Sequence, residues 1–120
     1  MHGFANPKRF MDISRWAMPL AAVLAFISFA FGLYLSFFVS PADYQMGDTV
    51  RIMFVHVPAS WLALVIYTVM AVASVAVIIW RHPVAEIAAK TAAPIGAVFT
   101  AISLVTGSLW GKPMWGTWWV

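Results

Sequence analysis

Residues 52–80 read IMFVHVPASWLALVIYTVMAVASVAVIIW, a continuous run without a single Asp, Glu, Lys or Arg. A membrane-crossing helix needs about 20 consecutive apolar residues, so this run is long enough to span a bilayer. Residues 16–42 and 91–111 are uncharged in the same way. The sequence therefore predicts an all-α, polytopic integral membrane protein with three transmembrane helices, at 16–39, 52–80 and 91–110.

The composition agrees with a membrane protein. Of the 120 residues, 63% are hydrophobic and 9% are charged, whereas about a quarter of an average soluble domain is charged. The first apolar run, at 17–39, is much longer than the roughly 7–15 residues of a signal-peptide core, which favours an uncleaved helix. The chain has no cysteine, so disulfides, thiolate metal sites and cysteine nucleophiles are excluded.

The charged residues predict the topology. Three basic residues precede the first helix and two bracket the connection 81–90, whereas the connection 40–51 carries two aspartates against one arginine. Cytoplasmic loops are enriched in Lys and Arg. We therefore expect the arm 1–15 and the loop 81–90 in the cytoplasm, and the loop 40–51 and the segment 111–120 outside. The net charge of +3 flanks the spans rather than forming a patch, so it indicates topology and not nucleic-acid binding.

His56 is the one titratable group inside a predicted span. Such a residue is costly to bury in a membrane and usually faces a bundle interior or a watery cavity. At 100° per residue it falls on one stripe with three other polar residues, which should face protein rather than lipid: Ser60, Tyr67 and Ser74. Two interpretations stay open, an axial ligand for a metal or cofactor and an interhelical hydrogen bond.

Pro58 suggests where the second helix begins. Proline is tolerated in the first turn of a helix and disruptive further inside, so we expect regular helix from about Val57, with residues 52–56 as an approach or kinked turn. His56 would then lie at the outer mouth of the span. The partial positive charge of a helix N-terminus favours neutral imidazole, the form that binds metals.

The third span differs from the other two in its pattern of small residues. Small residues recur at spacings of three and four, which lets two helix backbones approach closely: Gly96, Thr100, Ser103 and Gly107. We expect this stripe to pack against another helix. Pro94 is expected in the first turn, at the cytoplasmic end.

Tryptophan is concentrated at the end of the sequence, in GKPMWGTWWV (111–120) and just before it. An interfacial aromatic belt is the simplest explanation, because indole rings prefer the headgroup zone. Gly111 and Pro113 are expected to interrupt the helix after Trp110. If the segment turns helical again, i, i+3 and i+4 spacing puts three tryptophans on one face as an aromatic shelf: Trp115, Trp118 and Trp119.

Such a shelf suits a large planar apolar ligand with anionic groups, because rings stack on it and a cation meets the carboxylates. Haem fits this description, with His56 at the same outer level as an axial ligand of the iron. Lys112, at the edge of the shelf, and Arg51 are candidates to contact the haem propionates. Arg51 could equally be an outer-end anchor.

Two stretches, MFVHVPASW (53–61) and AAPIGAVFTAISLVTGSLWGKPMWGTWW (92–119), closely resemble the haem exporter protein C family of cytochrome c maturation. The hallmark of that family is a tryptophan-rich outer segment with the pattern WGxxWxWD. Its beginning is matched here by four residues: Trp115, Gly116, Trp118 and Trp119. The sequence stops at Val120, where the pattern's next Trp and Asp would come.

The resemblance implies a protein of six helices that holds haem b on the periplasmic side of the bacterial inner membrane. It implies two outer-loop histidines as axial ligands and the tryptophan segment as platform, including Gly116. His56 matches the first histidine and the second would lie in a later half, so this chain looks like the first half of a longer protein. The partners implied are a periplasmic haem chaperone, an ATP-binding-cassette ATPase, a second membrane subunit and a small single-span subunit.

Two other classes of function fit the sequence less well. A subunit of a substrate-translocating transporter would line its path with the polar stripe, but below Ser60 the stripe is sparse and neutral, which counts against a continuous path. A membrane enzyme would need positioned acid and base groups, whereas Asp43 and Asp48 are loop residues and Glu86 is on the opposite side. We therefore expect haem binding and transfer rather than catalysis, and weak haem binding by this chain alone.

Overall fold

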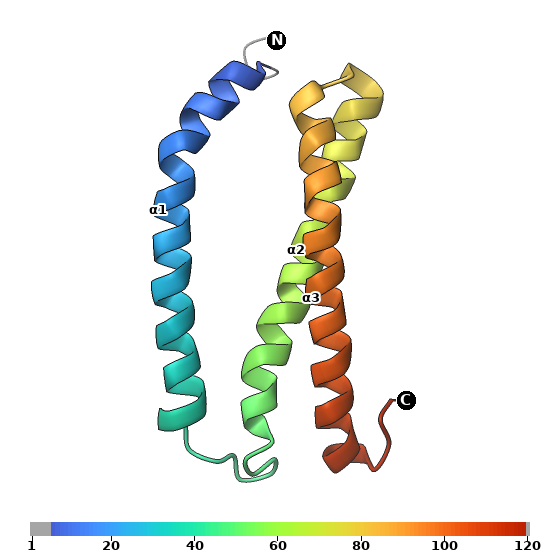
Figure 1. Cartoon of the computed structure of the whole chain (residues 1–120). Helices are drawn as coiled ribbons and strands as arrows, with labels where there is room; N and C mark the ends of the chain where they lie inside the picture. The colour runs from blue at the N-terminus through green and yellow to red at the C-terminus, as the bar shows by residue number, and fades with distance from the viewer. Residues whose placement is uncertain (1–5, 120) are drawn as a thin grey trace.

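The computed structural model describes residues 6–119, which form three long helices joined by short connections (Figure 1). Helix α1 (Pro7–Tyr34) continues into a π-helical turn, η1 (Leu35–Val39), and is followed by α2 (Val50–Trp80) and α3 (Pro83–Trp115). Within this described part of the chain there is no strand, only one isolated β-bridge in the α1–α2 connection. The first five residues of the predicted arm 1–15, and Val120, lie outside the described residues.

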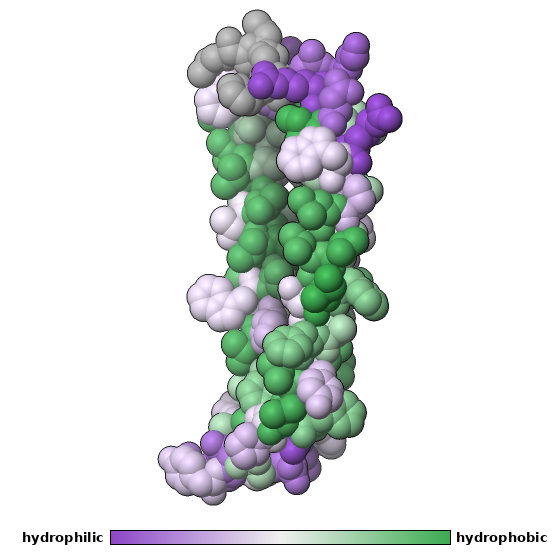
Figure 2. Space-filling model, turned by 90° about the vertical axis from the view of Figure 1, so that its left-hand side faces the viewer, coloured by the Kyte–Doolittle hydropathy of each residue, from purple (hydrophilic) through white to green (hydrophobic). Residues whose placement is uncertain are grey.

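All three helices are long and apolar enough to cross a membrane. On the face that Figure 2 shows, a broad hydrophobic band covers the middle of the molecule, and hydrophilic residues gather toward the two ends. A surface of this kind is stable in lipid because each helix satisfies its own backbone hydrogen bonds. The prediction of an all-α polytopic membrane protein with three spans is confirmed.

Helices α2 and α3 pack along each other, whereas α1 stands apart (Figure 1) and buries no residue. The residues buried within the described chain are all small: Ala59, Ala63, Ala73, Gly96 and Gly111. Small side chains allow two helix backbones to come close, which is how helices associate in lipid. The predicted packing role of the small-residue stripe on α3 is confirmed.

Between α1 and the α2–α3 pair lies an open apolar groove of about 710 Å³. Its walls carry large side chains from all three helices, among them Phe29, Leu33, Val57, Leu62, Phe99 and Ile102. The first helix therefore makes few contacts with the α2–α3 pair.

The α2–α3 connection is shorter than the predicted loop 81–90. Arg81 ends α2 in the left-handed conformation with φ 49°, and the Nδ1 atom of His82 accepts a hydrogen bond from the Ala85 backbone amide, which caps α3. Pro83 is the first residue of α3, where a missing N–H costs nothing. Pro94 consequently lies inside α3, not in its first turn as the sequence suggested.

The two ends of the molecule hold different parts of the chain. The start of α1 and the α2–α3 connection lie at one end, and the α1–α2 connection and the C-terminal residues at the other (Figure 1). This is the alternation that the charge pattern predicted. Which end faces the cytoplasm stays a prediction.

Candidate functional site

His56 lies in the second turn of α2, since that helix begins at Val50. The expected helix start near Val57 is therefore wrong, and Pro58 sits inside the helix. Membrane helices tolerate an internal proline because neighbouring groups satisfy the freed carbonyl. The influence of the helix dipole fades beyond the first turn, so the tautomer of the His56 ring depends on the groups that the ring contacts.

The His56 ring is hydrogen-bonded to α3. Its Nδ1 atom is 3.0 Å from the carbonyl oxygen of Ser103 and 3.1 Å from the hydroxyl oxygen of Thr106. One turn further along α2, the hydroxyl oxygens of Ser60 and Ser103 are 2.6 Å apart. The interhelical hydrogen bond expected as one interpretation of His56 is thus present, and it engages a single ring nitrogen.

The rest of the polar stripe is not turned toward α3 in the same way. Ser74 is exposed and donates to the carbonyl of Met70 on its own helix, and the Tyr67 side chain is 48% exposed. The Cε2 atom of the Tyr67 ring lies 3.9 Å from the position that a Cβ on Gly96 would take. The expectation that the whole stripe faces protein is wrong for Ser74 within this chain.

The tryptophan segment also differs from its prediction. Helix α3 runs through Gly111 and Pro113 to Trp115 and ends where Gly116 takes φ 75°, a conformation that glycine adopts without strain. Residues 116–119 are not helical, so Trp118 and Trp119 do not continue a helical face with Trp115. The expected break after Trp110 is absent.

The residues after the helix fold back over its last turns. A Cβ on Gly111 would meet the Trp115 ring at 3.4 Å and the carbonyl oxygens of Thr117 and Trp118 at 3.5 Å each, and Gly111 is buried. Gly111 follows Gly107 by one helical turn, so the two share a face of α3. The His56 ring lies against Gly107, with Cε1 2.9 Å from its Cβ position. His56 and the tryptophan segment therefore contact the same face of α3, at positions about one turn apart.

Aromatic contacts at this end are mostly made by Trp110. Its ring meets that of Trp115 edge-on, with centroids 5.0 Å apart, and its Nε1–H donates to the sulfur of Met46 at 3.3 Å. Trp118 and Trp119 stay 47% and 75% exposed. These two rings and Trp115, which is 57% exposed, offer aromatic surface to a ligand.

Lys112 lies at the edge of these rings, as expected. Its ammonium donates to the carbonyl of Gly116 at 3.0 Å and stands 5.6 Å from the centre of the Trp118 ring. One hydrogen bond uses one of the three donors of an ammonium. Lys112 can therefore hold the end of α3 and still meet an anion.

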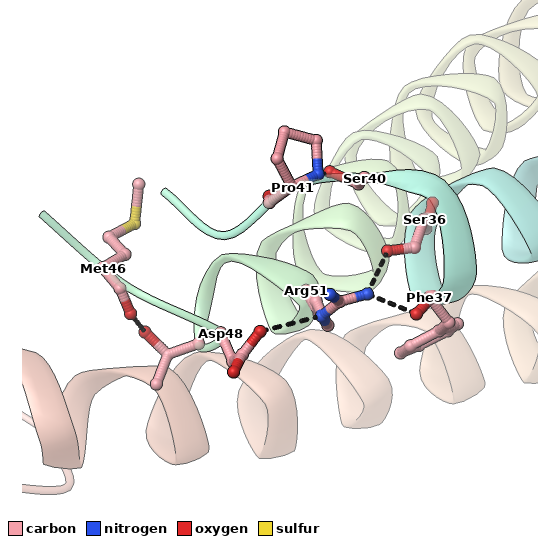
Figure 3. A network of polar contacts seen from close by, with 8 residues as sticks. Ser36, Phe37, Ser40, Pro41, Met46, Asp48 and Arg51 are labelled. Carbon is pink, nitrogen blue, oxygen red and sulfur yellow. Dashed lines mark hydrogen bonds and ion pairs between the residues drawn. The ribbon is translucent and has the colours of Figure 1, made fainter. Parts of the chain in front are cut away.

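Arg51 has a defined structural task at the same end (Figure 3). Its Nη1 atom donates to the carbonyl oxygens of Ser36 and Phe37, in the π-helical turn η1 that follows α1, and its Nε donates to Asp48 at 3.3 Å. A cation beside exposed carbonyls complements the negative end of a helix. The anchor interpretation of Arg51 is supported by these contacts, and a propionate could use only the remaining Nη2 donors.

A family model described as Heme exporter protein C matches residues 1–120, the whole chain. The chain belongs to the haem exporter protein C family. Among its relatives are the Heme exporter protein C of Bradyrhizobium diazoefficiens, 53% identical over 115 residues, and that of Escherichia coli strain K12, 47% identical over 120 residues. A ccmC-like mitochondrial protein of cytochrome c biosynthesis from Marchantia polymorpha is 50% identical over 116 residues.

These matches cover 96%, 100% and 96% of this chain, but 43%, 49% and 50% of the respective relatives. The chain thus spans about half the length of the haem exporter proteins C that it matches. The family membership predicted from the tryptophan motif is confirmed.

Three residues around the histidine and the α1–α2 connection carry no signal in the sequence: Thr106, Met46 and Met114. Thr106 contacts the His56 ring, and Met46 and Met114 contact the aromatic end of α3 and Thr49. The spacing of the small residues did mark the correct face of α3. Nothing in the sequence pairs Met46 with Trp110, because 64 residues separate them.

Proposed function

We propose that this chain is the haem-binding first half of an inner-membrane protein that handles haem in cytochrome c maturation. In this proposal His56 coordinates the iron through Nε2, the porphyrin lies against Trp115, Trp118 and Trp119, and Lys112 meets a propionate. The observation that carries the proposal is the His56 ring itself. One of its nitrogens is held by α3, and the other is available at the end of the molecule that bears the exposed tryptophans.

The other features of the site support the same proposal. Flat aromatic surface, a neutral imidazole and a nearby cation are the groups that bind haem. Among the described residues no cluster of three or more His, Cys, Asp or Glu side chains could hold a metal ion. Haem iron, which is already held by the porphyrin, would need fewer side chains from this site than a bare ion would.

The position of the site fits a protein that gives haem away. The tryptophan rings are exposed at the end that the charge pattern places outside the cytoplasm. Haem b bound there would be open to a periplasmic chaperone. We propose that the ATP-binding-cassette ATPase, the second membrane subunit and the single-span subunit act on the loaded protein, and that the chain itself only binds and transfers haem.

The alternative function, a subunit that passes a substrate across the membrane, has less support. His56 and Ser60 are each hydrogen-bonded to α3, the Ser60 hydroxyl also donates to the carbonyl of His56 on its own helix, and Ser74 is exposed. A translocation path would need polar groups that continue along one wall.

The proposal is tested by the visible spectrum of the chain purified in detergent with excess haem, because weak haem binding is expected of this chain alone. His56→Gly should abolish the haem absorption bands of the wild type, and free imidazole should restore them. His82→Gly is the matched control, because His82 caps α3 at the opposite end of the molecule. Bands that survive in His56→Gly, or that disappear equally in His82→Gly, would refute the assignment of His56.

A further inference from the structure

We propose that α3 positions His56 for iron: the Ser103 carbonyl and the Thr106 hydroxyl hold the proton on Nδ1, and the missing side chain of Gly107 makes room for the ring. This inference rests on the proposed function, since it explains how His56 presents Nε2 to haem. Ser103, Thr106 and Gly107 are positioning residues and need not touch the ligand.

The first step concerns the proton on the ring. A carbonyl oxygen can only accept a hydrogen bond, so Nδ1, at 3.0 Å from the Ser103 oxygen, must be the donor. The Thr106 hydroxyl already donates to the carbonyl of Ile102 at 2.6 Å, and it too is left to accept from Nδ1. Both neighbours therefore select the tautomer with Nδ1–H.

The second step concerns the other nitrogen. In neutral imidazole with a proton on Nδ1, the lone pair that binds a metal is on Nε2. Nε2 has no hydrogen-bond partner among the described residues. Every fully buried side-chain nitrogen or oxygen of these residues does have a partner, so Nε2 is not fully buried. Metal-binding histidines usually donate their second N–H to a carbonyl or carboxylate in this way.

The third step concerns space. A Cβ on Gly107 would stand 2.9 Å from Cε1 of His56, closer than real Cβ contacts, and 3.3 Å from Nδ1, which is a tight contact, so the ring would have to shift. Alanine at 107 would therefore push the ring away from its two acceptors. Alanine is a better helix former than glycine, so a functional loss in Gly107→Ala would not come from a weakened helix.

Gly96 provides a matched control on the same stripe. A Cβ there would meet Ile66 Cγ2 at 3.1 Å and Tyr67 at 3.9 Å, and not the histidine. Gly96→Ala therefore disturbs the packing of α2 on α3 while leaving the His56 ring in place. If Gly107 acted only through helix packing, the two alanine variants would behave alike.

The first measurement uses the haem-free chain in detergent micelles, labelled with ¹⁵N on its histidines, with His56→Gln to assign the signal. We expect a protonated Nδ1 and an unprotonated Nε2 in the wild type and in Gly96→Ala, and a mixture of tautomers in Gly107→Ala. A wild type with the proton on Nε2, or a Gly107→Ala variant with the wild-type tautomer, would overturn the inference.

The second measurement is a haem titration followed by absorption. Loss of an outer partner of a metal-binding histidine typically lowers metal affinity by about 10- to 100-fold, and we expect a decrease of this order in Gly107→Ala and a smaller one in Thr106→Val. Thr106→Ser, which keeps the hydroxyl, and Gly96→Ala should retain wild-type affinity. Equal losses in Gly107→Ala and Gly96→Ala would overturn the inference.

The two measurements separate the inference from the proposed function. If His56→Gly keeps the haem bands, the assignment of His56 as ligand fails, while the ring tautomer still decides whether α3 orients the histidine.

Discussion

The contact between Ser60 and Ser103 gives a quantitative test of how α2 and α3 associate. The Ser60 hydroxyl donates to the carbonyl of His56 at 2.8 Å, so in the 2.6 Å contact it accepts from the Ser103 hydroxyl. Interhelical hydrogen bonds in membrane proteins contribute about 0.6 kcal/mol on average and at most about 1.7 kcal/mol. We expect a coupling energy in this range, which corresponds to roughly a 3- to 18-fold change in the unfolding equilibrium.

The assay is a double-mutant cycle of Ser60→Ala, Ser103→Ala and the double variant, unfolded reversibly by SDS in mixed micelles and followed by tryptophan fluorescence. The cycle isolates the pairwise term from the separate effects of each substitution. Ser74→Ala is the matched control on α2, because that hydroxyl is exposed and bonds only to its own helix; its effect should stay below about 0.5 kcal/mol. A coupling energy indistinguishable from zero would refute the reasoning.

Three further predictions concern the ends of the helices. Arg51→Lys keeps the charge but loses the planar guanidinium that reaches two carbonyls. Amide hydrogen exchange in the α1–α2 connection should become roughly fivefold faster, as expected for a loss of about 1 kcal/mol. Unchanged exchange would contradict the role of Arg51 as an anchor. Trp110→Phe removes the N–H donated to sulfur and should cost about 0.5–1.5 kcal/mol of unfolding free energy. Trp61→Phe, at a residue that is 66% exposed, should cost little, and equal losses in the two variants would speak against the contact. Gly116→Ala places a side chain on a residue with φ 75° and should destabilise the end of α3 by about 1–2 kcal/mol. Amide hydrogen exchange measures this loss. Gly32→Ala is the control and should be neutral or stabilising, because a Cβ there would meet nothing within 4 Å.

Local patterns were sufficient where a property depends on the surrounding lipid. The three spans follow from uncharged runs, because a charge in hydrocarbon is costly whatever the neighbouring helices do. The small-residue stripe of α3 also predicted its packing face. The spacing of Gly96 and Gly107 indicates that face without knowledge of the residues that pack on it. The tryptophan pattern predicted the family.

Proline and glycine misled the prediction of helix ends. Pro58, Pro94 and Pro113 all lie inside helices, although each was expected at a boundary. A proline disrupts a helix in water, but in lipid an interrupted helix would expose several unsatisfied backbone groups, so the helix continues through it. The true end of α3 is at Gly116, where glycine adopts a left-handed conformation.

The uncharged runs and the tryptophan pattern therefore establish a membrane protein of this family, with a histidine in its second span. The contacts of that histidine could be known only from the folded chain. Ser103 lies 47 residues away along the sequence, and nothing local specifies which carbonyl meets which ring nitrogen. The pairing arises because Gly107 lets α2 and α3 approach until the imidazole reaches the α3 backbone. The physical reason is that hydropathy is a sum over residues, whereas the tautomer of one ring depends on two atoms brought together by packing.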